Sequence, residues 1–177
     1  MLKALGLSSV RIEHREPVVS KFGSGLALGE PVTLERAQRR FPVLVPRAVG
    51  QPDAVYLGEN PTRVDLVYRA RPGLPRASTT GAGFLVTELR ATVTPVIQKT
   101  IGAATHFERL SVGGDPAYFF SGGRHGFAYV PPTGAMGFED QRLAGNTLLV
   151  ERGDGLLLRI EGRLSRAAAV RIALSAR

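Results

Sequence analysis

The sequence contains no cysteine and no tryptophan, and only three of its 23 basic residues are lysine. The absence of cysteine excludes disulfide bonds, thiol nucleophiles and thiolate metal ligands. No apolar run approaches the roughly 20 residues that a helix needs to cross a bilayer. The first ten residues are too short for the apolar region and cleavage site of a signal peptide. The chain is therefore either cytosolic or separated from its targeting segment.

What the sequence does contain is typical of one globular domain. It has 177 residues, of which 44% are hydrophobic and 21% charged. Disorder would require fewer apolar residues and more charge, and this length suits a single hydrophobic core. We expect one domain over residues 1–177, with residues 1–30 as a peripheral N-terminal segment and residues 31–177 as the α+β core.

The charge is strongly positive, with a formal net value of +8 and a pI of about 10.7. Such a balance favours polyanionic partners. The arginines are scattered, however, and the densest cluster is only Arg36, Arg39 and Arg40. A nucleic-acid module more often combines a basic stripe with exposed aromatic residues. An arginine-rich proteome explains the charge equally well, so a cytosolic nucleic-acid-binding protein stands as an alternative only.

The first two-thirds of the chain predicts short helices among strands. Thr33 is an N-cap residue, and apolar residues then recur at helical spacing until Pro42 ends the helix. Residues 41–46 lie between prolines and are predicted to be extended. Strands are expected at 10–14, 55–57, 63–70, 84–90, 107–112, 117–121 and 126–130, short helices at 1–7 and 94–100, and loops at 72–83 and 131–141.

The C-terminal third has the clearest pattern. Residues 147–151 and 156–161 alternate apolar and polar residues on either side of Asp154-Gly155, which predicts a β-hairpin. Arg159 and Glu161 are expected to point to solvent. Ser165 caps a last helix, whose buried side is expected to comprise Val170, Ala173 and Leu174.

Strands follow one another through short turns, without the regular alternation with helices that a parallel sheet requires. The predicted fold class is therefore α+β, mainly antiparallel sheet with a few short helices packed on one face or end.

Known catalytic and cofactor motifs fail on spacing or context. No histidine pair has metal-ligand spacing, and His106 with Glu108 supplies two ligands at most. The chain has neither the G-x-S-x-G elbow nor the phosphate-loop motif, and Val86 replaces the third glycine of a dinucleotide fingerprint. Three strand carboxylates, Glu88, Glu151 and Glu161, are interpreted as charges on an outer sheet face. We therefore expect no enzyme, no cofactor and no metal site.

One stretch suggests a binding site. Residues 118–129 concentrate aromatic side chains, a histidine and an arginine around the Gly122-Gly123 turn. Aromatic residues that alternate along a hairpin usually pack into a core on one face and cover the sheet on the other. The alternative interpretation is a shallow ligand pocket with Arg124 and His125 at its rim and Tyr118 and Tyr129 as further ligand contacts.

A longer pattern of structural residues resembles a known group. It includes Phe-Pro-Val-Leu-Val-Pro at 41–46, Val-Asp-Leu-Val-Tyr at 64–68, Gly-Phe-Leu-Val-Thr-Glu at 83–88, and Leu-Ala-Gly-Asn-Thr-Leu-Leu-Val-Glu at 143–151. From about residue 33 to the end, the chain resembles the extracytoplasmic domain of uncharacterised single-span bacterial membrane proteins. These are related to the DUF4367 group of sporulation and anti-sigma-factor-like proteins. The resemblance implies an outside-facing domain tethered by an upstream helix, and it transfers no catalytic residue.

The first functional hypothesis is accordingly a non-catalytic extracytoplasmic sensing or binding domain of a membrane-tethered bacterial protein. It would bind an unknown ligand or protein partner against the sheet or at an exposed sheet edge. An envelope carrier of lipids or lipoproteins, holding an apolar cargo on a concave sheet, is a second hypothesis. Both place the protein outside the cytoplasm, whereas the nucleic-acid alternative places it inside.

Overall fold

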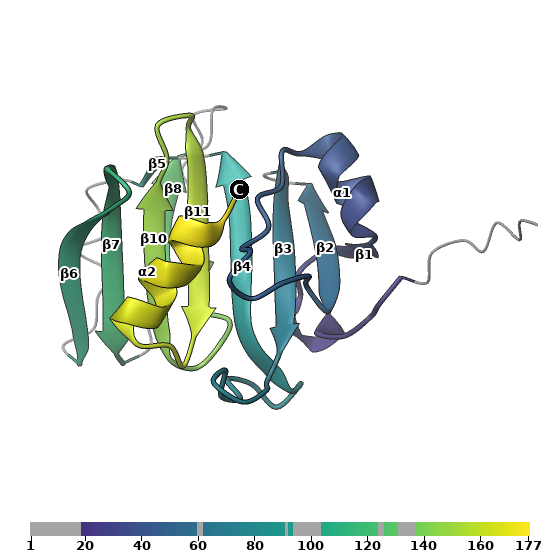
Figure 1. Cartoon of the computed structure of the whole chain (residues 1–177), viewed down its shortest axis with the longest axis horizontal. Helices are drawn as coiled ribbons and strands as arrows, with labels where there is room; N and C mark the ends of the chain where they lie inside the picture. Colours follow the sequence, from purple (N-terminus) through teal and green to yellow (C-terminus); the bar gives the residue numbers. More distant parts are fainter. Residues whose placement is uncertain (1–18, 60–61, 91, 94–103, 124–125, 131–136) are drawn as a thin grey trace, which may run out of the picture.

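The large sheet of the molecule is antiparallel and has eight strands in the order β1-β2-β3-β4-β11-β10-β7-β6 (Figure 1). A computed structural model describes residues 19–59, 62–90, 92–93, 104–123, 126–130 and 137–177. A second, three-stranded sheet has the order β5-β8-β9 and lies behind the large sheet in Figure 1. The elements in chain order are η1 (Ser24–Leu26), β1 (Glu30–Val32), α1 (Leu34–Arg40), β2 (Ala54–Glu59), β3 (Thr62–Arg69), β4 (Ala82–Arg90), β5 (Thr92–Val93), β6 (Thr105–Val112), β7 (Asp115–Gly122), β8 (Gly126–Val130), β9 (Gly137–Asp140), β10 (Asn146–Glu151), β11 (Leu156–Gly162) and α2 (Arg166–Ser175).

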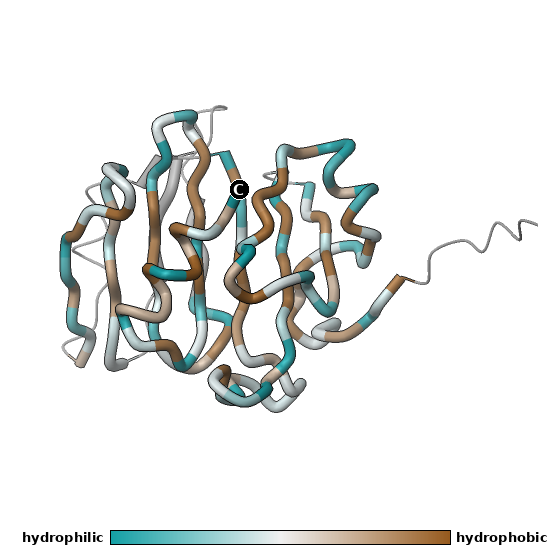
Figure 2. Tube along the Cα trace, in the orientation of Figure 1, coloured by the Kyte–Doolittle hydropathy of each residue, from teal (hydrophilic) through white to brown (hydrophobic). Residues whose placement is uncertain are grey.

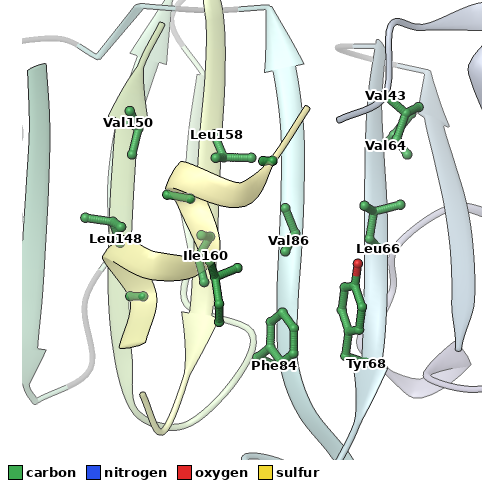
Figure 3. Close-up of a cluster of buried hydrophobic side chains, with 14 of the residues drawn as sticks. Val43, Val64, Leu66, Tyr68, Phe84, Val86, Leu148, Val150, Leu158 and Ile160 are labelled. Carbon is green, nitrogen blue, oxygen red and sulfur yellow. The ribbon is translucent and has the colours of Figure 1, made fainter. Parts of the chain in front are cut away.

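One face of the large sheet, here called the helical face, is covered by α1, α2 and an extended strap of residues 41–49 (Figure 1). The strap runs from the end of α1 to the last turn of α2, where Arg47 N donates to Ser175 O at 3.1 Å. Side chains on alternate strand positions form the main core beneath this cover, as Figure 3 shows. They include Val64, Leu66 and Tyr68 of β3, Phe84 and Val86 of β4, and Leu158 and Ile160 of β11.

Local sequence explains both helices. The Thr33 hydroxyl accepts from Arg36 N at 3.1 Å, and the Ser165 hydroxyl accepts from Ala168 N at 3.2 Å. Each bond satisfies an amide that the first turn leaves without a helical partner. The helix that follows Thr33 and the strap after it are as predicted. In the last helix, Ala169, Ile172 and Ala173 are buried while Leu174 is half exposed, so the expected burial of Leu174 is wrong.

The opposite, reverse face of the sheet is also covered. One cluster there gathers residues of β2, β3 and β4 with Leu28, Leu143 and the partly buried Phe22. A second cluster comprises Leu89, Phe120, Leu149 and Leu157, with Phe107 and Tyr118 packed against it. Strands β4 and β11 are therefore buried on both faces, and hydrophobic segments run through the middle of the sheet in Figure 2.

The predicted fold class is confirmed, since the described part of the chain is α+β, mainly antiparallel sheet with two α-helices. The Asp154-Gly155 hairpin joins β10 to β11, with Gly155 at a φ of 78° that suits glycine. The loop predicted at 131–141 contains β9, so that prediction is wrong in part. The predicted elements at 1–7, 10–14 and 94–100 lie outside the described residues. Among the described helices, none is long and apolar enough to cross a membrane.

Candidate functional site

The two ends of the large sheet differ in how they present their backbone. At one end, β1 has three residues and contains Pro31, which has no N–H to donate. At the other end, β6 has eight residues without proline and pairs only with β7 in the described sheet. Proteins commonly shield sheet edges with short strands and prolines. By this criterion the β1 end is shielded and the β6 end is open.

The register identifies which β6 residues point their backbone groups outward. Gly113 and Gly114, with φ of 64° and 97°, form a two-residue turn between β6 and β7. Such a turn makes the flanking pair, Val112 and Asp115, a hydrogen-bonded pair. Alternate β6 residues therefore bond to β7, and the residues between them direct their N–H and C=O groups away from the sheet. Among these outward residues are Phe107, Arg109 and Ser111.

An aromatic patch lies beside this edge on the reverse face. The rings of Phe107 and Tyr118 stack with centroids 5.8 Å apart, and Phe107 contacts Phe120 at 5.3 Å. The guanidinium of Arg109 lies 5.8 Å from the centre of the Tyr118 ring, within cation–π range. Phe107 and Tyr118 are only partly buried and Arg109 is exposed. The patch therefore combines apolar surface with one positive charge next to free backbone groups.

The helical-face side of the same edge carries a charge pair. Glu108 of β6 forms an ion pair with Arg166, the first residue of α2, and both side chains are about half exposed. His106 is exposed on the same side of the strand. His106 and Glu108 are thus surface polar residues. A segment lying along β6 would meet aromatic rings on one side and opposite charges on the other.

A second cluster of charged and polar side chains lies at the centre of the reverse face. Asp65, Thr87 and Arg159 are direct neighbours on β3, β4 and β11, and all three are buried. Asp65 accepts from Arg142 and from Arg63, each at 3.0 Å. The buried Arg159 pairs with the buried Glu161 two residues along its strand. The expectation that Arg159 and Glu161 point to solvent is therefore wrong.

These charges attach a loop to the sheet. The Glu161 carboxylate accepts from Arg142 N at 3.1 Å and from Leu143 N at 3.3 Å. The side chain of Arg142 reaches across to Asp65, and Leu143 enters the apolar cluster beside it. Buried carboxylates and guanidiniums that satisfy one another and the backbone are a structural solution to burying charge. The cluster therefore holds the segment after β9 on the reverse face.

The third strand carboxylate lies on the other side of the sheet. Glu88 is buried on the helical face, where both of its oxygens accept from Leu44 N of the strap, at 3.2 and 3.0 Å. Burial raises the pKa of Glu88 to about 8, although the Leu44 hydrogen bond and the charge of Arg152 oppose the rise. Glu88 and Glu161 are thus on opposite faces, and their expected exposure is wrong for both.

The predicted ligand contacts are distributed as follows. Tyr118 belongs to the aromatic patch, and Tyr129 lies on β8, paired with Val93 and Gly137 in the small sheet. Arg124 and His125 lie outside the described residues. Phe107 and Arg109 were missed by the sequence analysis, although the alternation of Phe107, Arg109 and Ser111 along a predicted strand was the available signal. No three histidine or acidic side chains of the described part gather to hold a metal ion.

The described residues form an α+β domain whose antiparallel sheet is covered on both faces and open at the β6 edge. Comparisons with protein-family models, with curated proteins and with solved structures find no match to the chain.

Proposed function

We propose that this chain is a non-catalytic binding domain that recognises an extended segment of a protein partner by strand addition at β6. The observation that carries the proposal is the β6 edge, which is open within the described residues and has outward-facing backbone at Phe107, Arg109 and Ser111 next to the aromatic patch. Strand addition draws affinity from main-chain hydrogen bonds and specificity from contacts to alternate side chains.

The surroundings of β6 suggest what the partner segment carries. Its residues on the reverse-face side would lie against Phe107 and Tyr118, which favours an aromatic or branched apolar side chain there. An acidic residue on that side would sit near the exposed Arg109. On the other side, the Glu108–Arg166 pair favours polar partner residues. The segment is therefore expected to alternate apolar or acidic residues with polar ones.

The proposed setting follows the resemblance to extracytoplasmic domains of single-span bacterial proteins. In that setting, capture of a partner segment outside the membrane would serve sensing, and the tether would hold the domain at the surface. The test of this setting is protease treatment of intact spheroplasts that express the full-length protein. Cleavage of the domain without lysis supports an outside location, and protection until lysis contradicts it.

The strand-addition test uses a peptide library displayed on phage and selected on the folded domain. Selected peptides are then synthesised, and their dissociation constants are measured for Arg109→Pro and for the matched control Arg109→Ala. Both variants remove the side chain, but only proline also removes the outward N–H without breaking a bond to β7. We expect at least a tenfold loss of affinity for Arg109→Pro beyond any loss for Arg109→Ala, and equal circular dichroism for both variants.

Three outcomes contradict strand addition. Equal peptide affinity of the proline and alanine variants would show that the outward N–H takes no part in binding. If substitutions on another surface weaken peptide binding while Arg109→Pro does not, the peptide binds elsewhere. Selection of no peptide with micromolar or better affinity would remove the basis for a peptide-binding edge.

A further inference from the structure

The outermost ridge of α2 combines an exposed leucine with arginine. Ala169, Ile172 and Ala173 face the sheet, so residues 167, 171 and 174 lie on the opposite side of the helix at i, i+4 and i+7. All three are exposed, and Leu174 retains 50% of its surface. Val19 is the other large hydrophobic residue that is exposed in the described part of the chain. Leu174 is therefore an exposed apolar residue next to Arg171 on this ridge.

Further arginines lie around the end of this helix. The strap places Arg47 next to the last turn of α2, because Arg47 N bonds to Ser175 O and Ala48 N bonds to the Ser175 hydroxyl. Arg177 follows the helix and is exposed. Arg47, Arg171 and Arg177 have no carboxylate within ion-pair distance among the described residues, unlike Arg166, which pairs with Glu108. Together with Leu174 they form a surface here called the α2 patch.

A small hollow opens beside the α2 patch. It has a volume of about 170 Å³ and lies between the end of α2 and the β6–β7 turn. Arg152, Leu174 and Arg177 line it together with apolar residues and Asp115. The Asp115 carboxylate accepts from Gly153 N at 3.2 Å and contributes one negative charge to the lining. The hollow thus offers two guanidinium groups next to the exposed leucine.

We infer that the α2 patch docks on an anionic phospholipid surface. Arginine side chains would contact lipid phosphates, for which the planar guanidinium is well suited. Leu174 would enter the headgroup layer, as apolar residues of interfacial helices do.

A lipid surface explains the patch better than a nucleic acid does. Nucleic-acid surfaces usually add aromatic side chains on which bases stack. The α2 patch has an aliphatic side chain at that place, whereas the partly exposed aromatic residues Phe107 and Tyr118 lie on the reverse face. An exposed leucine surrounded by arginines is the chemistry of an interface between water and lipid.

The inference is independent of strand addition, because the patch lies on the helical face and the peptide-binding backbone of β6 is not part of it. Its test exploits the absence of tryptophan from the chain. Leu174→Trp introduces a single tryptophan on the ridge, and Val19→Trp is the matched control at the other exposed apolar position of the described residues. The probes are vesicles of phosphatidylcholine alone and vesicles that also contain phosphatidylglycerol.

With phosphatidylglycerol vesicles, the emission of Leu174→Trp is expected to shift to shorter wavelength, and the shift is expected to reverse with added salt. Neither phosphatidylcholine vesicles nor Val19→Trp should give the shift. The charge contribution is measured by vesicle sedimentation of Arg171→Gln, with Arg76→Gln as a variant of equal net charge. Arg76 adjoins Ala77, which packs in the reverse-face cluster. We expect about a fivefold weaker partition for Arg171→Gln and no comparable change for Arg76→Gln.

Equal effects of Arg171→Gln and Arg76→Gln would show that vesicle binding depends on net charge alone, and would overturn the inference. The same spectral shift in both tryptophan variants would also overturn it, because insertion would not be specific to the ridge. A single-stranded oligonucleotide serves as the competing polyanion. Binding of the oligonucleotide through Arg171, without any binding to phosphatidylglycerol vesicles, would assign the patch to nucleic acid and contradict the lipid assignment.

Discussion

At the scale of single residues, the sequence pattern identifies which side chains share a face but not whether that face is covered. Asp65, Arg159 and Glu161 alternate with apolar neighbours, which is the pattern of a sheet with one solvated face. In the structure, the reverse face is covered by loops and by apolar clusters, so these charges are buried. Asp65 pairs with Arg142, 77 residues further along the chain, and Glu161 accepts from the backbone N of the same Arg142. No local pattern could supply that information.

Glu88 gives a prediction about pH. Its pKa is about 8 in the folded protein, against 4.5 for the same group without burial. A carboxyl group whose pKa is raised by folding favours the folded state while it is protonated, and this contribution is lost as pH rises through the folded pKa. Wild-type stability is therefore expected to fall between about pH 5 and pH 8, by up to about 4 kcal/mol if Glu88 alone is responsible.

The matched variant is Glu88→Gln, whose amide oxygen can still accept from Leu44 N. It removes the charge and keeps the shape, so its unfolding free energy should vary less with pH over the same window. The measurement is urea unfolding of both proteins at several values of pH. A slope of stability against pH that is the same in the two proteins would show that Glu88 does not titrate with a raised pKa.

At the scale of elements, local chemistry was sufficient where a cap or a turn determines the structure. Thr33 and Ser165 begin the two α-helices, and Asp154-Gly155 forms the predicted hairpin. The pairing of β4 with β11 could not be predicted, because it joins residues that are about 70 positions apart, as Val86 and Ile160 are. The outward ridge of α2 was also misjudged, since helical spacing alone did not distinguish Leu174 from the inward Ile172. The position of β6 at the edge also depends on long-range pairing, because β7 lies between β6 and β10 in the sheet.

The buried charge cluster gives a prediction about how loop and sheet depend on each other. Glu161→Ala leaves the buried Arg159 without its carboxylate and frees Arg142 N and Leu143 N of a bond. Removing one partner of a buried pair typically costs about 3–5 kcal/mol, and we expect a loss of that size in urea unfolding.

The control is the apolar pair Arg159→Met with Glu161→Leu, which removes both charges and keeps most of the volume. This double variant should be more stable than Glu161→Ala, because no charge is left buried alone. A double-mutant cycle with the single variants Arg159→Met and Glu161→Leu measures the coupling between the two side chains. A double variant that loses as much as the two single variants combined would contradict the view that the pair, rather than each charge, is the stabilising unit.

At the scale of the whole molecule, the described residues protect the sheet on both faces and at the β1 edge but not at the β6 edge. Strands β4 and β11 are central and buried throughout, whereas β6 is mostly exposed along its length. Stability against local opening should follow this arrangement, because amides in central strands exchange only when most of the protein unfolds. The difference between the centre and the β6 edge is thus measurable without any partner.

Amide hydrogen exchange followed by nuclear magnetic resonance tests the edge residue by residue. The amides of His106, Glu108 and Leu110 bond to β7 and should be protected, whereas the outward amides of Phe107, Arg109 and Ser111 should exchange much faster. The amides of β4 and β11 should be the slowest. When a selected peptide is added, only the outward β6 amides should gain protection. Slow exchange of those amides in the free protein would mean that the edge is already covered, and strand addition could not then use it.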